Sequence, residues 1–300
     1  MGIESSRRSL RENPQSADSL LTVDHIKRNT TNMLVFLPRD RQFMFALADH
    51  LLHPEGEALP RDVDAPTAAA LLARGMACRP PVCGAVYGTL LNDRDAVAAL
   101  GDAMHAAPYK APPKAPVLYL KPRNTLAGHR ARVVVPDNAL GVQVGASLGI
   151  VIGRTATRVS VDRAFDYVAG YTLVADLSVP HESVYRPSVR FRARDGFCVI
   201  GPAVVAARHI SAPDNLPINV SINQTRTFTA STAASVRNVS HLLADVTDFM
   251  TLAAGDVITL GVPHGSPVAH VGDTATLSIG TMPPLTVSFI GAEQLNGDQP

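Results

Sequence analysis

The sequence lacks an excess of charge of either sign. Its 27 lysine and arginine residues stand against 26 aspartate and glutamate residues, which leaves a formal net charge of +1. Non-specific binding to a phosphate backbone depends on a basic field over the protein surface. The composition therefore predicts that nucleic acid is not a partner of this protein.

Cysteines are also few. The chain has three, Cys78, Cys83 and Cys198, an odd number without the spacing of a metal-binding motif. Disulfide scaffolds belong mainly to short secreted domains. In a chain of 300 residues the three cysteines therefore indicate reduced, structural thiols.

Long apolar runs are absent too. No run approaches the roughly 20 residues that a membrane-spanning helix needs, and residues 1–8 lack the apolar core of a signal peptide. We therefore expect no membrane partner and a cytoplasmic location. The hydrophobic fraction of 46% still allows a chain of this length to bury a large core.

The most informative stretch that the sequence does contain is residues 141–153. Alternate side chains from Val142 to Ile152 are apolar, which is typical of a strand with one buried face. The opposite face carries four small or polar residues, Gln143, Gly145, Ser147 and Gly149. Such a face leaves room for a ligand or for closely approaching backbone, so we predict that it forms the wall of a pocket.

Short strands dominate the pattern from residue 82 onward. We predict helices at residues 42–52, 64–74, 94–106, 160–169 and 234–250, and a β-hairpin that turns at Asn223 and Gln224. Many short strands with few helices favour a mixed α/β architecture that is mostly β.

The pattern divides the chain into three parts. Residues 1–75 form an N-terminal extension of unknown role, which we expect to be dispensable. Residues 76–116 form a small strand and helix region that ends in a proline-rich connector. Residues 117–290 carry most of the remaining strands.

Four segments carry a family resemblance: residues 119–125, 151–158, 167–172 with Asp176, and 255–263. In order and spacing they resemble the fumarylacetoacetate hydrolase superfamily, over a region from about Val82 to Leu285. The resemblance implies that residues 117–290 form a catalytic-type domain with the β-roll and mixed-sheet fold of that superfamily.

Shorter segments narrow the resemblance further: residues 108–114, 185–187 and 194–198. They resemble the amino-terminal half, or separate first subunit, of the bifunctional isomerase/decarboxylase of 4-hydroxyphenylacetate (homoprotocatechuate) degradation. The resemblance implies a lyase and isomerase of aromatic compound catabolism. Its substrates would be 5-oxopent-3-ene-1,2,5-tricarboxylate and 2-hydroxyhepta-2,4-diene-1,7-dioate, which are small unsaturated keto acids with two or three carboxylates.

The resemblance also implies a divalent cation, Mg or Mn, held by two strand carboxylates one residue apart and a third from a following strand. Those positions fall on Gly145, Ser147 and Asp176, so that Asp176 alone keeps a carboxylate. Because these cations take about six oxygen ligands, we expect metal binding to be weak or absent. As an alternative role, Asp176 is a loop residue that caps backbone amides.

The acid/base residues of the family are altered as well. Its histidine position falls on Ala96, and its loop lysine falls on Arg192, which stays cationic and cannot act as a base. We predict Asp176 and Arg192 as catalytic residues from the resemblance, and Glu182 as a third from its place in the loop at residues 181–187. His181 and Glu182 offer an acid/base pair, although adjacent residues on a strand point apart.

Cationic side chains are kept around the same segments. Together with Arg192, the predicted substrate-binding residues are Lys121, Arg123, Arg186 and Arg194. A guanidinium group binds a carboxylate through paired hydrogen bonds, which suits a dicarboxylate substrate. The alternative for each of these side chains is a solvated rim.

Three hypotheses about function follow. In the first, the chain is an enzyme subunit of the isomerase/decarboxylase. In the second, it is a non-catalytic partner that supports a paralogous, metal-bearing second subunit. A third is a hydrolase of acylpyruvate-type substrates. Each predicts an oligomer, either with such a paralogue or with copies of this chain.

Overall fold

The computed structural model describes residues 43–47, 62–63, 78–82, 84–181, 183 and 188–296. The chain divides into two compact units, Met1–Met33 and Leu34–Pro300, and the second contains every described residue. Glu182, Arg186 and the helix predicted at residues 64–74 lie outside the described residues. Within the described ranges, no helix is long and apolar enough to cross a membrane.

Eleven of the described strands form the larger of two β-sheets. Its main path runs through β2 (Asp62–Val63), β1 (Phe43–Leu47), β10 (Cys198–Ala206), β9 (Val168–Ser178), β8 (Val142–Ile152), β13 (Val257–Thr259), β4 (Val86–Leu90) and β5 (Val117–Lys121). Off this path lie β3 (Cys78–Arg79) on β1, β6 (Leu126–Gly128) on β10 and β14 (Val268–Ala269) on β8. The strands that carry Gly145 and Asp176 therefore lie in the interior of the sheet.

The second sheet has five strands. Their order is β12 (Arg226–Ser231), β11 (Pro217–Ile222), β15 (Thr274–Ile279), β16 (Leu285–Ile290) and β7 (Ala131–Val134). One hydrophobic core cluster joins the sheets, because it contains Val144 and Leu148 of β8 together with Val220 of β11 and Leu277 of β15. The two sheets thus bury their apolar faces together.

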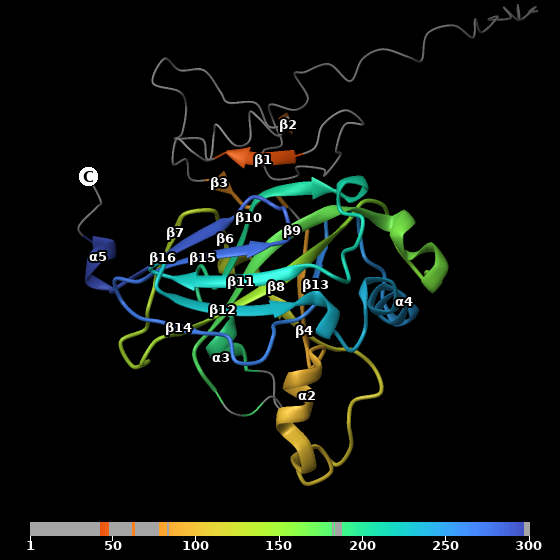
Figure 1. The fold of residues 1–300 in the computed structure, drawn as a ribbon, viewed down its shortest axis with the longest axis horizontal. Helices are drawn as coiled ribbons and strands as arrows, with labels where there is room; N and C mark the ends of the chain where they lie inside the picture. Colours follow the sequence, from red (N-terminus) through yellow and green to blue (C-terminus); the bar gives the residue numbers. More distant parts are fainter. Residues whose placement is uncertain are drawn as a thin grey trace, which may run out of the picture. The chain divides into compact units, whose positions relative to one another are not determined.

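The helices in the described part of the chain are short. They are α2 (Arg94–Leu100), α3 (Val189–Arg192), α4 (Val239–Phe249) and α5 (Glu293–Asn296), with 3-10 helices at Gly101–Met104, Arg123–Thr125, Val161–Tyr167, Ala207–His209 and Thr232–Ala234. Figure 1 shows α2, α4 and α5 at the periphery of the view and the strands in its centre. The predicted architecture, mixed α/β and mostly β, is confirmed.

The strand predicted at residues 141–153 is β8. It pairs antiparallel with β9, from Gln143 opposite Ser178 to Ile152 opposite Val168. Its alternate apolar side chains are fully buried, and each large aliphatic one contributes roughly 2 kcal/mol by leaving water. The period-2 pattern thus predicted which face of this strand enters the core.

Three sequence predictions of helices need correction. Residues 43–47 form a strand instead of a helix, because they pair antiparallel with β10 and such non-local pairing overrides local propensity. The helix predicted at residues 160–169 ends at Tyr167 as a 3-10 helix, and Gly170 is a strand residue opposite Val151. The last helix begins only at Val239, where the Asn238 side chain caps it.

The predicted hairpin is confirmed. β11 and β12 pair antiparallel up to Ile222 opposite Arg226. The turn residues Asn223 and Gln224 have φ angles of 52° and 59°. Both therefore adopt a left-handed conformation within a three-residue loop, 223–225, that contains no glycine.

Candidate active site

A fully buried ion pair joins two predicted site residues. Lys121, the last residue of β5, places its Nζ 2.6 Å from Oδ1 of Asp176 on β9, and neither side chain is exposed. The same ammonium group donates hydrogen bonds to the carbonyl oxygens of Leu177 at 3.1 Å, Arg192 at 3.2 Å and Phe197 at 2.9 Å. Because these three hydrogen bonds use all three protons of the ammonium group, Lys121 attracts Asp176 Oδ1 by its charge and donates no hydrogen bond to it.

Tyr119 and Arg192 complete the surroundings of Asp176. The hydroxyl of Tyr119 donates to Asp176 Oδ2, and Arg192 Nη1 lies 3.7 Å from Asp176 Oδ1. The guanidinium group of Arg192 also lies over the Tyr119 ring, 4.8 Å from its centroid. Burial, together with the negative charge of Asp176, raises the pKa of Tyr119 well above its usual value. Tyr119 is thus a fixed donor and does not serve as a base near neutral pH.

The other two positions expected to bind a metal, Gly145 and Ser147, are in contact with protein atoms. Gly145 lies directly opposite Asp176 in the ladder, but a Cβ atom there would come within 2.6 Å of Val262 Cγ1 and 2.8 Å of the Asp176 carbonyl oxygen. The hydroxyl of Ser147 accepts a hydrogen bond from the Gly261 amide at 3.1 Å. The face predicted as a pocket wall is therefore packed against the loop after β13 at both positions.

These residues do not fit a divalent cation. Mg and Mn require several carboxylate or carbonyl oxygens around one point, whereas Asp176 is the only carboxylate of the three positions. A lysine ammonium group already neutralises it. Among the described residues, no group of three or more His, Cys, Asp or Glu side chains is arranged to hold a metal ion.

A cavity of about 340 Å³ lies next to this ion pair. It is lined by Thr89, Leu90, Leu91, Ala96, Ala99, Leu100, Tyr119, Gln143, His181, Arg192, Val262, Pro263, His264 and Gly265. Of the face predicted as a pocket wall, only Gln143 reaches this cavity. Ala96, on α2, puts a methyl group on the wall at the position where the family resemblance implies a histidine.

His181 is held in this cavity by two contacts. Its Nδ1 lies 2.9 Å from the Val179 carbonyl oxygen, and its ring stacks on Phe191 at 5.2 Å between centroids and 10° between planes. Burial is the main cause that lowers the pKa of His181; the hydrogen bond with Val179 opposes it in part, and the positive charge of Arg192 lowers this pKa further. The half-buried imidazole is thus held neutral at neutral pH.

The remaining predicted residues are not gathered there. Arg123 is exposed in the 3-10 helix after β5, and Arg194 donates from Nε to the Arg190 carbonyl oxygen. Neither lines the cavity, while Glu182 and Arg186 lie outside the described residues. Sequence reasoning missed Tyr119, which shares a face of β5 with Lys121 because strand side chains alternate with period 2.

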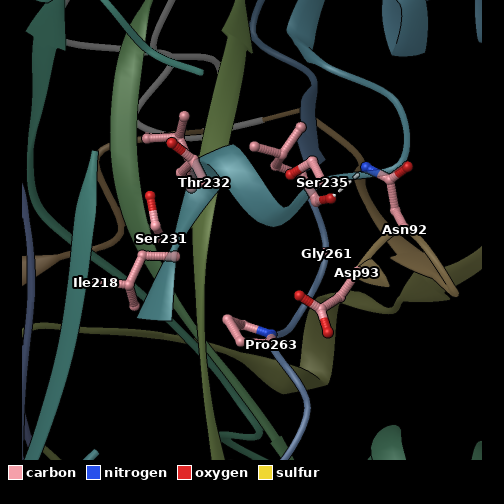
Figure 2. A pocket seen from close by; sticks show the side chains of 10 residues that line it. Asn92, Asp93, Ile218, Ser231, Thr232, Ser235, Gly261 and Pro263 are labelled. Carbon is pink, nitrogen blue, oxygen red and sulfur yellow. Dashed lines mark hydrogen bonds between the residues drawn. The ribbon is translucent and has the colours of Figure 1, made fainter. Parts of the chain in front are cut away.

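A second, much smaller cavity lies where α2 and the loop after β13, which both line the larger cavity, are joined. It holds about 10 Å³, enough for roughly one water molecule, and Figure 2 shows Asn92 and Asp93 on one side of it and Ser231 and Thr232 on the other. The Asp93 carboxylate accepts hydrogen bonds from the backbone amides of Ala96 and His264. One buried side chain thus joins the start of α2 to the loop that faces it across the larger cavity.

Asn92 fixes the same junction from the other side. Its side-chain amide donates to the carbonyl oxygens of Arg237 at 2.9 Å and Leu260 at 2.7 Å, and its Oδ1 accepts from the Arg237 amide at 2.8 Å. Because all three bonds end on backbone atoms, Asn92 has a structural role.

The fold and the composition of the site define a class of protein. Residues 85–290 match the family model described as fumarylacetoacetate (FAA) hydrolase C-terminal. The chain therefore belongs to the fumarylacetoacetate hydrolase family, as the resemblance in the sequence implies.

Individual relatives agree with this membership. The chain is 39% identical over 202 residues to the 4-hydroxyphenylacetate degradation bifunctional isomerase/decarboxylase of Escherichia coli, a match that covers 67% of this chain and 46% of that protein. The chain thus spans about half the length of the curated relatives it matches.

Solved structures of related proteins share the fold. The 2-hydroxyhepta-2,4-diene-1,7-dioate isomerase of Mycobacterium marinum superimposes with a TM-score of 0.60 at 27% identity, covering 72% of this chain and 78% of that one. Fumarylpyruvate hydrolase of Pseudomonas aeruginosa, in complex with Mn²⁺ and pyruvate, gives a TM-score of 0.62 at 16% identity, over 86% of this chain and 99% of that one. The fold predicted from the family resemblance is confirmed.

Proposed function

We propose that this chain is a subunit of the isomerase/decarboxylase of 4-hydroxyphenylacetate (homoprotocatechuate) degradation. In this proposal it binds a small unsaturated keto acid with two or three carboxylates and holds no divalent metal of its own. The similarity to the Escherichia coli isomerase/decarboxylase supports the pathway. The observation that carries the metal-independent role is the packing of Val262 against Gly145, where the family resemblance implies a carboxylate.

Arg192 is the proposed anchor for the substrate. It lines the cavity of about 340 Å³, and its Nε is a buried donor without a hydrogen-bond partner in the part of the chain that the structure describes. A buried donor left unpaired costs about 1–3 kcal/mol, and a substrate carboxylate would supply the missing acceptor. In this role Asp176 and Lys121 position Arg192 and do not themselves bind a metal.

The proposed division of labour follows from the chemistry of the two reactions. Loss of CO2 from a keto acid is assisted by a Lewis acid that accepts the electron pair, which is what a divalent cation supplies in a metal-bearing subunit. Isomerisation needs only a base and a group that stabilises an enolate. We therefore assign decarboxylation to a paralogous second subunit and substrate binding, with isomerisation, to this chain.

Two alternatives are distinguished by experiment. A wholly non-catalytic partner would bind the second subunit and carry out neither reaction. A hydrolase of acylpyruvate-type substrates, such as the Mn²⁺-bound fumarylpyruvate hydrolase of the same fold, would consume acylpyruvates. The described residues around Asp176 do not fit a metal ion that would activate water, which favours the isomerase/decarboxylase subunit over the hydrolase.

The experiment measures both reactions with this chain alone, with its paralogue alone and with a mixture of the two. We expect decarboxylation only where the paralogue is present. We also expect Arg192→Gln to raise KM for the keto acid at least tenfold, since a charged hydrogen bond is lost. Arg163→Gln is the matched control, because Arg163 is exposed on the 3-10 helix Val161–Tyr167. Full decarboxylation by this chain alone, or hydrolysis of acylpyruvates, would overturn the proposal.

A further inference from the structure

We infer that His181 is the proton-transfer group of a metal-independent isomerisation in the cavity, with Arg192 stabilising the enolate that forms. The inference rests on the proposed function and deepens it. It names a catalytic residue at a position other than Ala96, where the family resemblance implies a histidine.

The tautomer of His181 is fixed by its backbone contact. A carbonyl oxygen can only accept a hydrogen bond, so the 2.9 Å contact with Val179 makes Nδ1 the protonated nitrogen. Nε2 of the neutral ring then carries the lone pair that a general base needs. The sequence placed His181 beside Glu182, but the geometry provides an oriented base without that neighbour.

Two consecutive residues of α3, Phe191 and Arg192, position the base and supply the cation. His181 stacks on Phe191, and the next residue is Arg192, which lines the same cavity. A short helix, α3, thus fixes both the plane of the imidazole and the position of the guanidinium group. A substrate bound through Arg192 is therefore presented to His181 with little freedom to rotate.

The surroundings of His181 favour the neutral imidazole that a general base requires. The titratable groups that line the cavity together with His181 are Tyr119 of β5, Arg192 of α3 and His264 of the loop after β13. Burial and Arg192 lower the pKa of His181, so the imidazole is unprotonated before substrate binds. Tyr119 keeps its proton because its pKa is raised.

Other candidates for proton transfer are already engaged. The hydroxyl of Tyr119 donates to Asp176, and the protons of Lys121 go to three carbonyl oxygens. Ala96 has no ionisable group. Among the described residues that line the cavity, His181 and His264 are the two that can accept a proton, and His264 is exposed.

The reaction balances without a co-reactant. In 2-hydroxyhepta-2,4-diene-1,7-dioate, His181 Nε2 removes the proton of the 2-hydroxyl group, and the O–H electron pair stays on the oxygen of a dienolate. Arg192 donates hydrogen bonds to that oxygen. The imidazolium then gives a proton to C5, where the C4=C5 electron pair forms the new C–H bond, while the C2=C3 pair moves to C3=C4 and an oxygen pair forms the C2 carbonyl.

The test uses the full chain and 2-hydroxyhepta-2,4-diene-1,7-dioate, with deuterium uptake from D2O into the substrate measured by NMR. His181→Asn keeps a side-chain N–H for the Val179 carbonyl oxygen but removes the base. We expect it to lower the exchange rate by about 10²–10⁴-fold with KM changed by less than about threefold. His241→Asn, on the exposed surface of α4, is the matched control.

The pH profile gives a second readout that a structural role would not move. In the wild-type chain the exchange rate should rise with pH through a midpoint below 6.5, because the base must be neutral. In the His181→Asn variant this rise should vanish. If that variant does not fold, as judged by its thermal melt, His181→Gln and the wild-type profile carry the test.

The outcomes separate the inference from the proposed function. Substrate binding without deuterium uptake by the wild-type chain, alone or mixed with the paralogue, overturns the role of His181 and leaves the binding role intact. Uptake that survives in His181→Asn but is lost in His264→Asn overturns it as well. Failure to bind the substrate and to support decarboxylation in the mixture would instead overturn the proposed function.

Discussion

At the scale of single residues, buried charge decides what this site can do. Lys121 and Asp176 form a pair with no exposure to water, and Tyr119 and Arg192 gather around the same carboxylate. Desolvation of such a pair is tolerated only when the charges stay together. The carboxylate is therefore committed to its internal partners, which restricts its use for a metal.

We predict that Lys121→Met strongly destabilises the protein. The change leaves the Asp176 carboxylate buried without its cation, which costs about 3–5 kcal/mol, measured as the free energy of unfolding in urea. The double variant Lys121→Met with Asp176→Asn keeps an acceptor for Tyr119 and should regain part of the loss. A double variant as unstable as Lys121→Met alone would contradict this account.

A second buried residue predicts how stability depends on pH. His129 is 5% exposed, its Nδ1 accepts a hydrogen bond from the Thr286 amide, and burial, with Arg130, lowers its pKa to about 4. The unfolded chain binds this proton first as pH falls from about 6.5. The contribution of His129 to the free energy of unfolding should therefore be fully present above about pH 6.5 and be lost as the pH falls to about 4.

The expected loss from His129 is roughly 3 kcal/mol between those two pH values. Urea unfolding at pH 7, 5 and 4 measures it. His129→Asn retains an acceptor for the Thr286 amide and does not titrate, so its stability should change less with pH. If the free energy of unfolding changed equally with pH in the variant and in the wild-type protein, His129 would not be the group responsible.

At the scale of elements, β8 and the loop after β13 decide the shape of the site. The side of β8 that the sequence predicts as a pocket wall is closed at Gly145 by Val262 and at Ser147 by Gly261. The cavity opens instead at Gln143, where it is lined by residues from α2 and β5. Because the loop after β13 packs on β8 at Gly145 and Ser147, the cavity lies further along β8, at Gln143.

Glutamate at positions 145 and 147 tests this packing. We predict that Gly145→Glu with Ser147→Glu lowers the free energy of unfolding by about 1–3 kcal/mol, since extra atoms in a packed core cause strain. Adding Val262→Ala should relieve part of that strain and raise the affinity for Mn²⁺, measured by titration calorimetry. Tight Mn²⁺ binding by the double variant without Val262→Ala would show that the space is open.

Local patterns predicted the elements better than they predicted the site. The apolar alternation of β8 and the turn at Asn223 could be read from neighbouring residues alone. The strand at residues 43–47 could not, because its partner β10 lies far along the chain. The contact between Gly145 and Val262 and the meeting of His181 with Arg192 depend on tertiary packing in the same way, so the sequence could name candidates but not their geometry.

At the scale of the whole molecule, the N-terminal part of the chain contributes to the larger sheet. Two strands from residues 1–75, β1 and β2, extend it beyond β10. Phe43, Met44 and Phe45 of β1 pair with Val205, Val204 and Ala203 of β10 in an antiparallel register. We therefore revise the expectation that residues 1–75 are dispensable, while their role and the division at residue 116 stay proposals.

Two truncations test how far the extension is needed. A chain that begins at Leu34 removes only the first compact unit, Met1–Met33, and is the reference for the shorter chain. A chain that begins at Met76 also removes β1 and β2. It leaves the outer edge of β10 unpaired beside Val204 and Val205, which are buried in the full chain.

For the Met76 truncation we expect a loss of about 2 kcal/mol, or roughly 4–8 °C in Tm for a domain of this size, and a tendency to aggregate. Aggregation follows because an unpaired, apolar strand edge is a template for pairing with another chain. Differential scanning calorimetry and light scattering measure the two effects. Equal melting temperatures for the two truncations would mean that β1 adds nothing to the stability of the sheet, and the extension would then be dispensable as the sequence alone suggests.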